Sequence, residues 1–245
     1  MTPVLSIRGL VKRFGGLLAV EGFDFDLAPG LITALIGPNG AGKTTVFNMV
    51  TGVLTADGGT VQLGGRTLLG LRPHRVAALG VARTFQDLRL FSNMTVRDNV
   101  LAVTERTPWL WQRGRGAARQ ARVEAALERV GLTARAGERA ADLPYADAKF
   151  LSLARVLATD APVWLLDEPA SGLDPASRDR FCGLLRAAAG AGTTICLIEH
   201  NLDIVAALSD RIAFLDRGRK LAEGEPQSIL GDPELAAIYF GERRG

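Results

Sequence analysis

A glycine-rich octapeptide, GPNGAGKT at positions 37–44, restricts the fold of this 245-residue chain more than any other feature. It fits the pattern G-x-x-x-x-G-K-[ST], follows the apolar run LITALI and precedes KTTVFNMV, a segment of helical character. Glycines allow successive backbone N–H groups to surround phosphate oxygens, and the N-terminus of the next helix adds positive potential. The sequence therefore predicts a strand, a phosphate-binding loop and a helix in that order.

The residues of this loop have different expected roles toward a nucleoside triphosphate. Lys43 is expected to bridge the β- and γ-phosphates, and the hydroxyl of Thr44 is expected to ligate Mg²⁺. A glycine-rich turn that fits the pattern by chance is the alternative, and the strand–loop–helix context argues against it. The other positions expected to contact the nucleotide are Gly37, Pro38, Asn39, Gly40, Ala41, Gly42 and Thr45.

Apolar runs of strand length recur along the chain, and their order predicts the fold class. VWLLDEP (163–169), TTICLIEH (193–200) and RIAFLD (211–216) are separated by segments of helical periodicity, which indicates a parallel sheet covered by helices. Three earlier segments, all before residue 66, alternate apolar and polar residues between glycines, as antiparallel strands do. We therefore expect an α/β fold with a parallel-sheet core and an N-terminal antiparallel β subdomain.

The middle of the chain has a different pattern, in which strand signals fade and helical periodicity dominates. Thr95, for example, can cap a helix that begins with VRDNV. We interpret residues 89–159 as a helical subdomain inserted into a nucleotide-binding core that is formed by residues 1–88 and 160–245.

Composition excludes several classes of function. The formal charge is only +3 despite a pI near 9.2, and no basic block stands out, which argues against a nucleic-acid partner. No apolar run approaches the roughly 18 residues that a membrane-spanning helix needs, and the N-terminus MTPVLSIRGL lacks the apolar region of a signal peptide. Any association with a membrane is therefore expected to be peripheral.

Two predicted strands end in residues that can act on a nucleotide. Asp167, at the end of the 163–169 run, is placed to hold the Mg²⁺ shell, and Glu168 follows where a general base can take a proton from water. An ordinary strand end is the alternative for each, and the phosphate-binding loop favours the catalytic interpretation. His200 ends another strand at the sheet edge where ligands bind in α/β folds, and it can hydrogen-bond a γ-phosphate.

The order of these motifs resembles that of the ATP-binding cassette (ABC) ATPases. The loop at 37–44 is followed by FQ at 85–86, DEP at 167–169, SGLD at 171–174 and the strand-end histidine, in the order of that family. The resemblance implies a P-loop NTPase (RecA-like) core with ATP and Mg²⁺ as ligands.

The resemblance also assigns roles to residues that the sequence alone leaves open. It implies that Gln86 contacts Mg²⁺ and the attacking water and relays motion to a membrane partner. Phe14 matches the aromatic residue that stacks on adenine, although a lone phenylalanine would otherwise be assigned to the core. Residues 171–174 match the loop that crosses the dimer interface in this family.

One branch of the family is more similar still. KRFGGLLAV, ARTFQDLRLFSNMTVRDNV and DRGRKLAEGEPQSIL resemble segments of the ATP-binding subunits of branched-chain amino-acid importers and of their urea or amide relatives. This similarity extends from about residue 4 to residue 241. It implies that a groove beside Gln86 receives a permease, with Leu90 and Phe91 as apolar contacts or, alternatively, as core residues.

The family signature is altered in this chain. It is usually L-S-G-G-Q at a helix N-terminus and resembles L-P-Y-G-Q-Q in the importer branch, whereas this chain has LPYADA at 143–148, followed by Lys149. A carboxylate at Asp147, if it points toward a γ-phosphate charge roughly 5 Å away, costs on the order of 3 kcal/mol at an effective dielectric near 20. The favourable effect of an acidic residue in a first helical turn is at most about 1 kcal/mol. We therefore expect a weakened phosphate clamp.

The weakened clamp has an asymmetric consequence, because each ATP site in this family combines one chain's P-loop with the other chain's signature. The site built on Glu168 and His200 is expected to hydrolyse ATP normally when a partner supplies an intact signature, whereas the site that uses Asp147 is expected to be weak. The sequence therefore favours a heterodimer with a second ABC ATPase chain over a homodimer.

These observations predict the ATP-hydrolysing motor subunit of an ABC importer, peripheral on the cytoplasmic face of the membrane. Its expected partners are permease subunits and, indirectly, a periplasmic or extracellular solute-binding protein. One alternative is a soluble ABC ATPase that acts on ribosomes or DNA, although such relatives usually carry two cassettes or a long coiled-coil insertion. Another is a weakly hydrolysing regulatory subunit, which the altered signature favours and the intact Glu168 disfavours.

Overall fold

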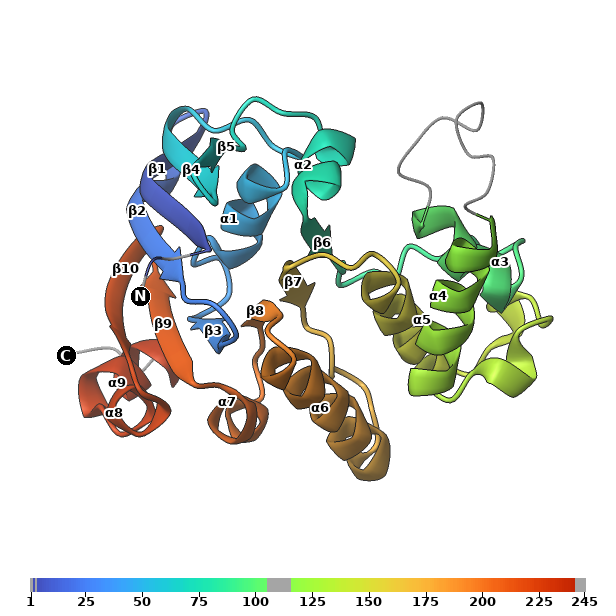
Figure 1. Cartoon of the computed structure of the whole chain (residues 1–245). Coiled ribbons are helices and arrows are strands. Elements are labelled where there is room, and N and C mark those ends of the chain that lie inside the picture. The colour runs from blue at the N-terminus through green and yellow to red at the C-terminus, as the bar shows by residue number, and fades with distance from the viewer. Residues whose placement is uncertain (1, 3, 105–115, 241–245) are drawn as a thin grey trace.

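The computed structural model describes residue 2, residues 4–104 and residues 116–240. Its N-terminal part forms a four-stranded sheet in the order β2–β1–β4–β5, in which every neighbouring pair is antiparallel. This sheet lies at one end of the molecule in Figure 1. The prediction of antiparallel strands in three segments before residue 66 is thus confirmed. The strands are β1 (Leu5–Phe14), β2 (Leu17–Leu27), β4 (Gly58–Leu63) and β5 (Arg66–Thr67).

A second sheet of six strands has the order β10–β9–β3–β8–β7–β6 and is parallel except for the pair of β9 and β10. All residues of β3, β7 and β8 are buried, as expected for parallel strands that are covered on both faces. The α/β prediction is confirmed. The strands are β3 (Ile32–Ile36), β6 (Val81–Arg83), β7 (Val163–Asp167), β8 (Thr194–Ile198), β9 (Arg211–Asp216) and β10 (Arg219–Gly224).

Helices cover the parallel sheet on both faces and divide the core in two. Along β7, Val163 and Leu165 belong to one hydrophobic cluster, and Trp164 and Leu166 belong to the other, because successive residues of a strand point to opposite faces. The first cluster joins the sheet to α1 (Lys43–Val50) and to the antiparallel sheet, so that α1 is enclosed between the two sheets. The second cluster includes side chains of α6 (Pro175–Gly190) and α7 (Leu202–Leu208), below the sheet in Figure 1.

The chain between β6 and β7 forms a helical block on the opposite side from both termini in Figure 1. Thr95 caps its first helix as expected, its hydroxyl accepting from the backbone N–H of Asp98 at 3.1 Å. Outside regular helices, the described residues of 89–159 include one isolated bridge, between Thr95 and Arg139. The helical segments are α3 (Val96–Val103), α4 (Gly116–Arg129), α5 (Tyr145–Leu157), η2 (Thr133–Arg135) and η3 (Ala140–Asp142).

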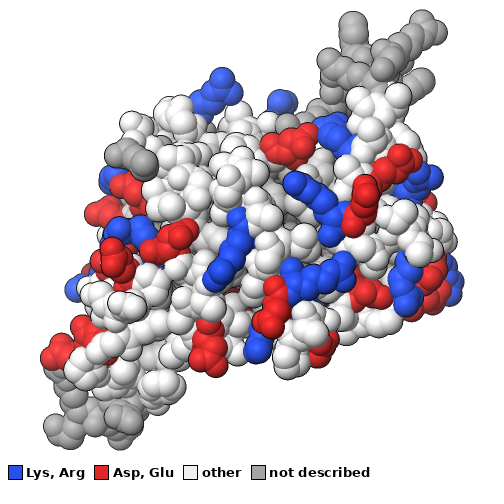
Figure 2. Space-filling model, turned by 60° about the horizontal axis from the view of Figure 1, so that its bottom comes forward, with Lys and Arg blue, Asp and Glu red and all other residues white. Residues whose placement is uncertain are grey.

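The remaining helices of the described residues are short. In the part of the chain that the structure describes, no helix combines the length and the apolar character that crossing a bilayer requires. On the face that Figure 2 shows, basic and acidic side chains are interspersed rather than gathered into a patch of one sign. The remaining helices are α2 (Pro73–Leu79), α8 (Pro226–Leu230) and α9 (Pro233–Phe240).

Candidate active site

The loops predicted to carry chemistry start at the same edge of the parallel sheet. In the strand register, Leu35 of β3 lies beside Ile198 of β8, which in turn lies beside Asp167 of β7. The carboxyl ends of these strands therefore lie level with one another, at the edge where α/β folds bind their ligands. The segments that leave this edge are the glycine-rich loop after β3, Asp167–Glu168 at the end of β7 and Glu199–His200 after β8, and the Gln86 segment leaves β6 on the neighbouring side.

Two glycines of the loop occupy positions that exclude a side chain. A Cβ atom at Gly37 would lie 1.8 Å from the carbonyl oxygen of Leu215, and at Gly42 it would lie 2.6 Å from that of Ala19. Both glycines also have positive φ angles, 147° and 107°. The loop therefore packs so closely against the backbone of β9 and β2 that only glycine fits at these two positions. Asn39 and Gly40, at the other side of the loop, are exposed.

The loop ends where α1 begins, at Lys43. The preceding Gly42 provides no side-chain cap, and the first turn of α1 contains no acidic residue. The first backbone N–H groups of a helix have no partner within the helix and attract anions. Thr44 and Thr45 lie in this first turn, so the predicted phosphate-binding positions are placed at a helix N-terminus.

The Lys43 side chain is folded over the loop. Its Nζ donates to the carbonyl oxygens of Gly37 at 2.6 Å and of Pro38 at 2.9 Å, and the residue is only 6% exposed. Burial lowers the pKa of Lys43, and the negative charges of Glu168 and Asp167 act in the opposite direction. The structure thus brings together the ammonium group and both predicted acidic residues.

Asp167 is a buried carboxylate with three polar contacts. It ends β7 and is 3% exposed; its side chain accepts from the hydroxyl of Thr44, and its Oδ2 lies 3.5 Å from a terminal nitrogen of Arg83. Its backbone N–H donates to the hydroxyl of Thr84 at 3.1 Å. Burial raises the pKa of Asp167, whereas the charge of Arg83 and the Thr44 hydrogen bond lower it.

These oxygen donors fit Mg²⁺. Thr44 and Asp167 are in contact, and Gln86 can add an amide oxygen; such hard oxygen ligands are those that Mg²⁺ prefers. Among the described residues, no three His, Cys, Asp or Glu side chains gather as a metal site, so Asp167 would share the ion with the Thr44 hydroxyl and the Gln86 amide. Such a sparse donor set agrees with the usual magnesium site, which combines one or two carboxylates with substrate phosphates and water.

Glu168 lies between Gln86 and His200, two of the other predicted catalytic residues. Its Oε1 lies 2.9 Å from Nε2 of His200, and its Oε2 accepts from Nε2 of Gln86 at 3.2 Å. The contact with His200 requires a proton on Nε2, because a carboxylate can only accept. The Glu168 side chain is 17% exposed, so it remains accessible to a water molecule while its two oxygens are held in place.

The backbone of Glu168 is unusual as well. Its φ angle is +47°, in the left-handed region that costs a non-glycine residue about 1–2 kcal/mol. Two hydrogen bonds of the Glu168 backbone offset that strain. The N–H donates to the carbonyl oxygen of Ile198 at 2.9 Å, and the carbonyl oxygen accepts from Nζ of Lys149 at 2.8 Å. Strained residues of this kind concentrate at functional sites.

The sequence analysis missed two residues that hold the segment after Glu168. Glu199 is 2% exposed, and its Oε1 accepts from the backbone N–H of Ala170 at 3.0 Å. Tyr145, in the first turn of α5, donates its hydroxyl to the carbonyl oxygen of Ser171 at 3.2 Å. A buried strand that ends in two titratable residues, Glu-His, was the available signal for Glu199, whereas nothing in the sequence indicates the tyrosine contact.

Phe14 ends β1 and is 48% exposed, with Nζ of Lys12 5.5 Å from the centre of its ring. An exposed aromatic ring can stack on a planar base. Its contact with adenine stays a prediction.

Asp147, the residue expected to weaken the signature, is ion-paired in this structure. Its Oδ2 lies 3.2 Å from Nε of Arg135 in η2, and its side chain is 26% exposed. Arg135 also contacts Glu138, at 3.0 Å, and is therefore shared between two carboxylates. The repulsion estimated for a lone carboxylate is thus an upper value, because Arg135 offsets part of the negative charge.

A groove of about 820 Å³ lies between α2, β6, the Gln86 segment, α3 and α5. Phe91 lines it and is 46% exposed, whereas Leu90 packs against the core and is absent from the lining. Four arginines line the groove, and no carboxylate does among the described residues. These arginines are Arg75, Arg83, Arg89 and Arg155.

Comparison with known proteins agrees with this geometry. The family model described as ABC transporter matches residues 20–171, more than half of the chain. The chain is 41% identical to the high-affinity branched-chain amino acid transport ATP-binding protein LivG of Escherichia coli K12 and 39% identical to BraF of Pseudomonas aeruginosa, which has the same description; each alignment covers 98% of both proteins.

Solved structures show the same fold over the whole chain. A nucleotide-free ATP-binding cassette from an ABC transporter superimposes with a TM-score of 0.88 at 28% identity, covering 98% of this chain and 100% of that one. The ADP conformation of another such cassette gives 0.87 at 29% identity, covering 99% and 100%. The chain therefore belongs to the ABC transporter family and is an ATP-binding subunit with ATPase function, as the order of its motifs had indicated.

Proposed function

We propose that this chain is the ATP-hydrolysing motor subunit of an importer of branched-chain amino acids. The observation that carries the catalytic part is the Glu168 carboxylate, held by Gln86 and His200 beside the Lys43 loop. The solute is proposed from the whole-chain similarity to LivG and BraF, whose names describe branched-chain amino acid transport. A related small polar solute, such as urea or a short amide, is the alternative cargo.

The proposed reaction divides the work among the residues at the sheet edge. The loop N–H groups and Lys43 bind the phosphates of ATP, and Phe14 stacks on the adenine. Glu168 accepts a proton from the attacking water, which Gln86 orients, and His200 hydrogen-bonds the γ-phosphate. Thr44, Asp167 and Gln86 would hold Mg²⁺, which when bound supplies positive charge that neutralises the phosphates.

The partner that we propose for the groove is a permease subunit, reached at the cytoplasmic face of the membrane. The groove is apolar at Phe91 and basic at its four arginines, which favours an amphipathic segment that carries a carboxylate.

We further propose that residues 89–159 form a helical subdomain against a core of residues 1–88 and 160–245. A solute-binding protein outside the membrane would act on this chain only through the permease.

We also propose that the working dimer contains a second ABC ATPase chain with an intact signature. The support is Asp147 at the signature position, whose charge Arg135 only partly offsets because Glu138 shares that arginine. In a homodimer both ATP sites would contain Asp147. In a heterodimer the site built on this chain's Glu168 would be completed by the partner.

The altered signature is tested with two variants, one that removes the negative charge of Asp147 and one that removes the positive charge of Arg135. Asp147→Gln combined with Ala146→Gly is expected to raise ATP turnover of the assembled complex about two- to tenfold, because it removes a charge facing the phosphate and frees Arg135. Arg135→Gln is expected to lower turnover, because it leaves Asp147 uncompensated.

Asp142→Asn is the matched control, because Asp142 pairs with Arg139 in the neighbouring turn, at 3.0 Å, and both are exposed. Unchanged turnover in both test variants would contradict the weakened clamp.

The proposed function is tested first by steady-state ATP hydrolysis of the purified chain, with Glu168→Gln as the blank, and then after assembly with permease subunits in lipid. We expect low hydrolysis alone and a clear rise when the transporter carries solute-loaded binding protein. Co-purification with ribosomes instead of permease would favour the soluble alternative. Turnover that stays at the blank in the complete assembly would favour a regulatory subunit.

A further inference from the structure

The most unusual polar contact outside the proposed catalytic residues is made by Arg83, at the end of β6. Its side chain is 6% exposed, and its Nε is buried without a hydrogen-bond partner among the described residues. Burial lowers the pKa of Arg83 to about 10, in spite of the nearby Asp167 charge. A buried cation with an unused donor is energetically unfavourable unless a further partner satisfies it, so its presence calls for an explanation.

The two terminal nitrogens of Arg83 contact the C-terminal end of α1 and the carboxylate of Asp167. One donates to Oδ1 of Asn48 at 2.8 Å and to the hydroxyl of Thr51 at 3.0 Å, at the C-terminal end of α1. The other lies 3.5 Å from Oδ2 of Asp167. The guanidinium group therefore connects the helix that follows the phosphate-binding loop to the carboxylate proposed to hold Mg²⁺.

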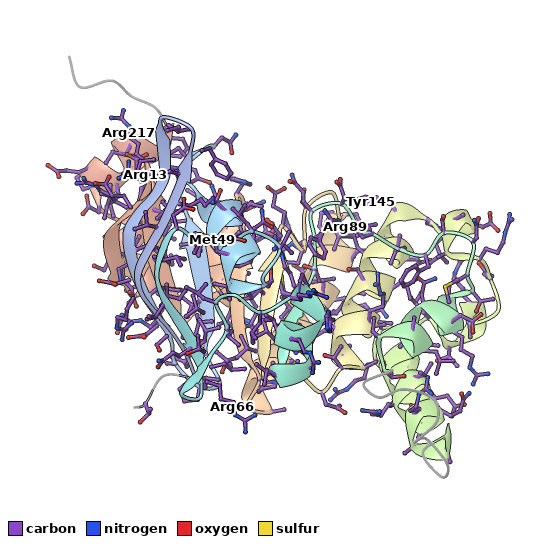
Figure 3. All side chains as sticks on the ribbon, turned by 90° about the horizontal axis from the view of Figure 1, so that it is seen from above. Arg13, Met49, Arg66, Arg89, Tyr145 and Arg217 are labelled. Atoms are coloured by element: carbon purple, nitrogen blue, oxygen red, sulfur yellow. The ribbon has the colours of Figure 1, made fainter. Side chains whose placement is uncertain are left out.

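The same side chain belongs to the wall of the groove. Arg83 lines the groove together with Phe85 and Arg89, and the guanidinium carbons of both arginines lie near the Phe85 ring, at 4.6 and 4.0 Å from its centre. Arg89, labelled in Figure 3, is connected to α5, because its carbonyl oxygen accepts from Arg155 at 2.9 Å. A segment that enters the groove would therefore press on the side chains that surround Arg83.

We propose that Arg83 is a positioning residue that connects the groove to Asp167. It lies 3.5 Å from Oδ2 of the Asp167 carboxylate and leaves the other oxygen for Mg²⁺. Its buried, unused Nε–H becomes available to a carboxylate or carbonyl of the docked segment only when that segment displaces the side chains around Arg83. Occupation of the groove thereby changes the orientation of Asp167. The role of the groove occupant depends on the proposed permease partner, whereas the link between Arg83 and Asp167 does not.

The link to Asp167 is tested on the isolated chain by binding of a fluorescent ATP analogue, first in EDTA and then with increasing Mg²⁺. Arg83→Met is expected to raise the Mg²⁺ concentration at half-saturation about tenfold, as is typical when a partner of a metal-holding carboxylate is lost. Arg83→Lys keeps the charge but loses the planar fork, and a smaller rise is expected. Binding in EDTA is expected to change little in either variant.

Arg122→Met is the matched control, because Arg122 also pairs with an aspartate, Asp160 at 2.8 Å, but on the surface of the helical block. A Mg²⁺ midpoint that does not move in Arg83→Lys or Arg83→Met would overturn the proposal. A lower midpoint in Arg83→Met would overturn it as well, because Arg83 would then act only by repelling the cation. Equal losses in EDTA and in Mg²⁺ would indicate a merely structural residue.

The link to the groove is tested in the assembled transporter. Arg83→Lys is expected to reduce the ratio of solute-stimulated to basal ATP hydrolysis at saturating Mg²⁺. A ratio equal to that of the wild type would overturn this part of the proposal. If the chain does not assemble with a permease at all, the proposed partner is wrong, while the Mg²⁺ titration of the isolated chain still decides the role of Arg83.

Discussion

Glu168→Gln is expected to lower ATP turnover of the assembled transporter about 10²- to 10⁴-fold, the usual contribution of a general base. The amide has nearly the same shape as the carboxylate but cannot take a proton from water. It also cannot accept from Gln86 and His200 with two oxygens at once, as the carboxylate does at 3.2 and 2.9 Å. Affinity for ATP is expected to remain within a few-fold of the wild type, because the phosphates are bound by the loop and Lys43.

The measurement is phosphate release at saturating ATP, together with equilibrium binding of a fluorescent ATP analogue. Glu124→Gln is the matched control, since Glu124 is exposed and pairs with Arg97 on the surface of the helical block. A Glu168→Gln enzyme that retains more than about a tenth of its turnover would assign the base to another group.

Lys43→Met is expected to weaken ATP binding about 10- to 100-fold, because hydrogen bonds to charged groups are worth about 1.5–3 kcal/mol. Methionine fills the space of the lysine stem, so the side chain remains packed. Removing a buried ammonium group also removes its desolvation penalty, which is the cause of the lowered Lys43 pKa. We therefore expect little change in the melting temperature of the nucleotide-free protein.

Binding of the fluorescent ATP analogue and thermal unfolding without nucleotide separate these two effects. Lys220→Met is the control, since Lys220 is paired with Glu223 at 2.7 Å, within β10. Equal affinity in Lys43→Met and wild type would mean that the contacts of Lys43 with Gly37 and Pro38 serve only to fold the loop.

The fold could be predicted because its main determinants are local in the sequence. Buried parallel strands appear as uninterrupted apolar runs, and β3, β7, β8 and β9 were all visible in this way. The strand order was not visible, because it depends on pairings between distant segments. The phosphate-binding loop was predictable for a physical reason as well: only glycine fits at residues 37 and 42 against the neighbouring carbonyl groups.

The contacts that adjust the site could not be predicted in the same way. Arg135 and Asp147 lie in different helical segments, and neither periodicity nor a motif indicates that they pair. Arg83 follows no pattern that distinguishes a buried arginine from a surface one. Phe91 and Leu90 are neighbours of similar hydrophobicity, and only the turn of the chain decides which one lines the groove.

The hydrogen bonds that join α5 to the segment after β7 have a consequence for how the two ATP sites of a dimer influence each other. In the proposed dimer, the N-terminus of α5 serves the nucleotide bound by the opposite chain. Through Lys149 and Tyr145 the same helix is tied to the carbonyl groups of Glu168 and Ser171 in its own chain. A rearrangement around Glu168 during hydrolysis therefore alters the contact offered to the other nucleotide. We therefore expect this one helix to couple the two sites of the proposed dimer.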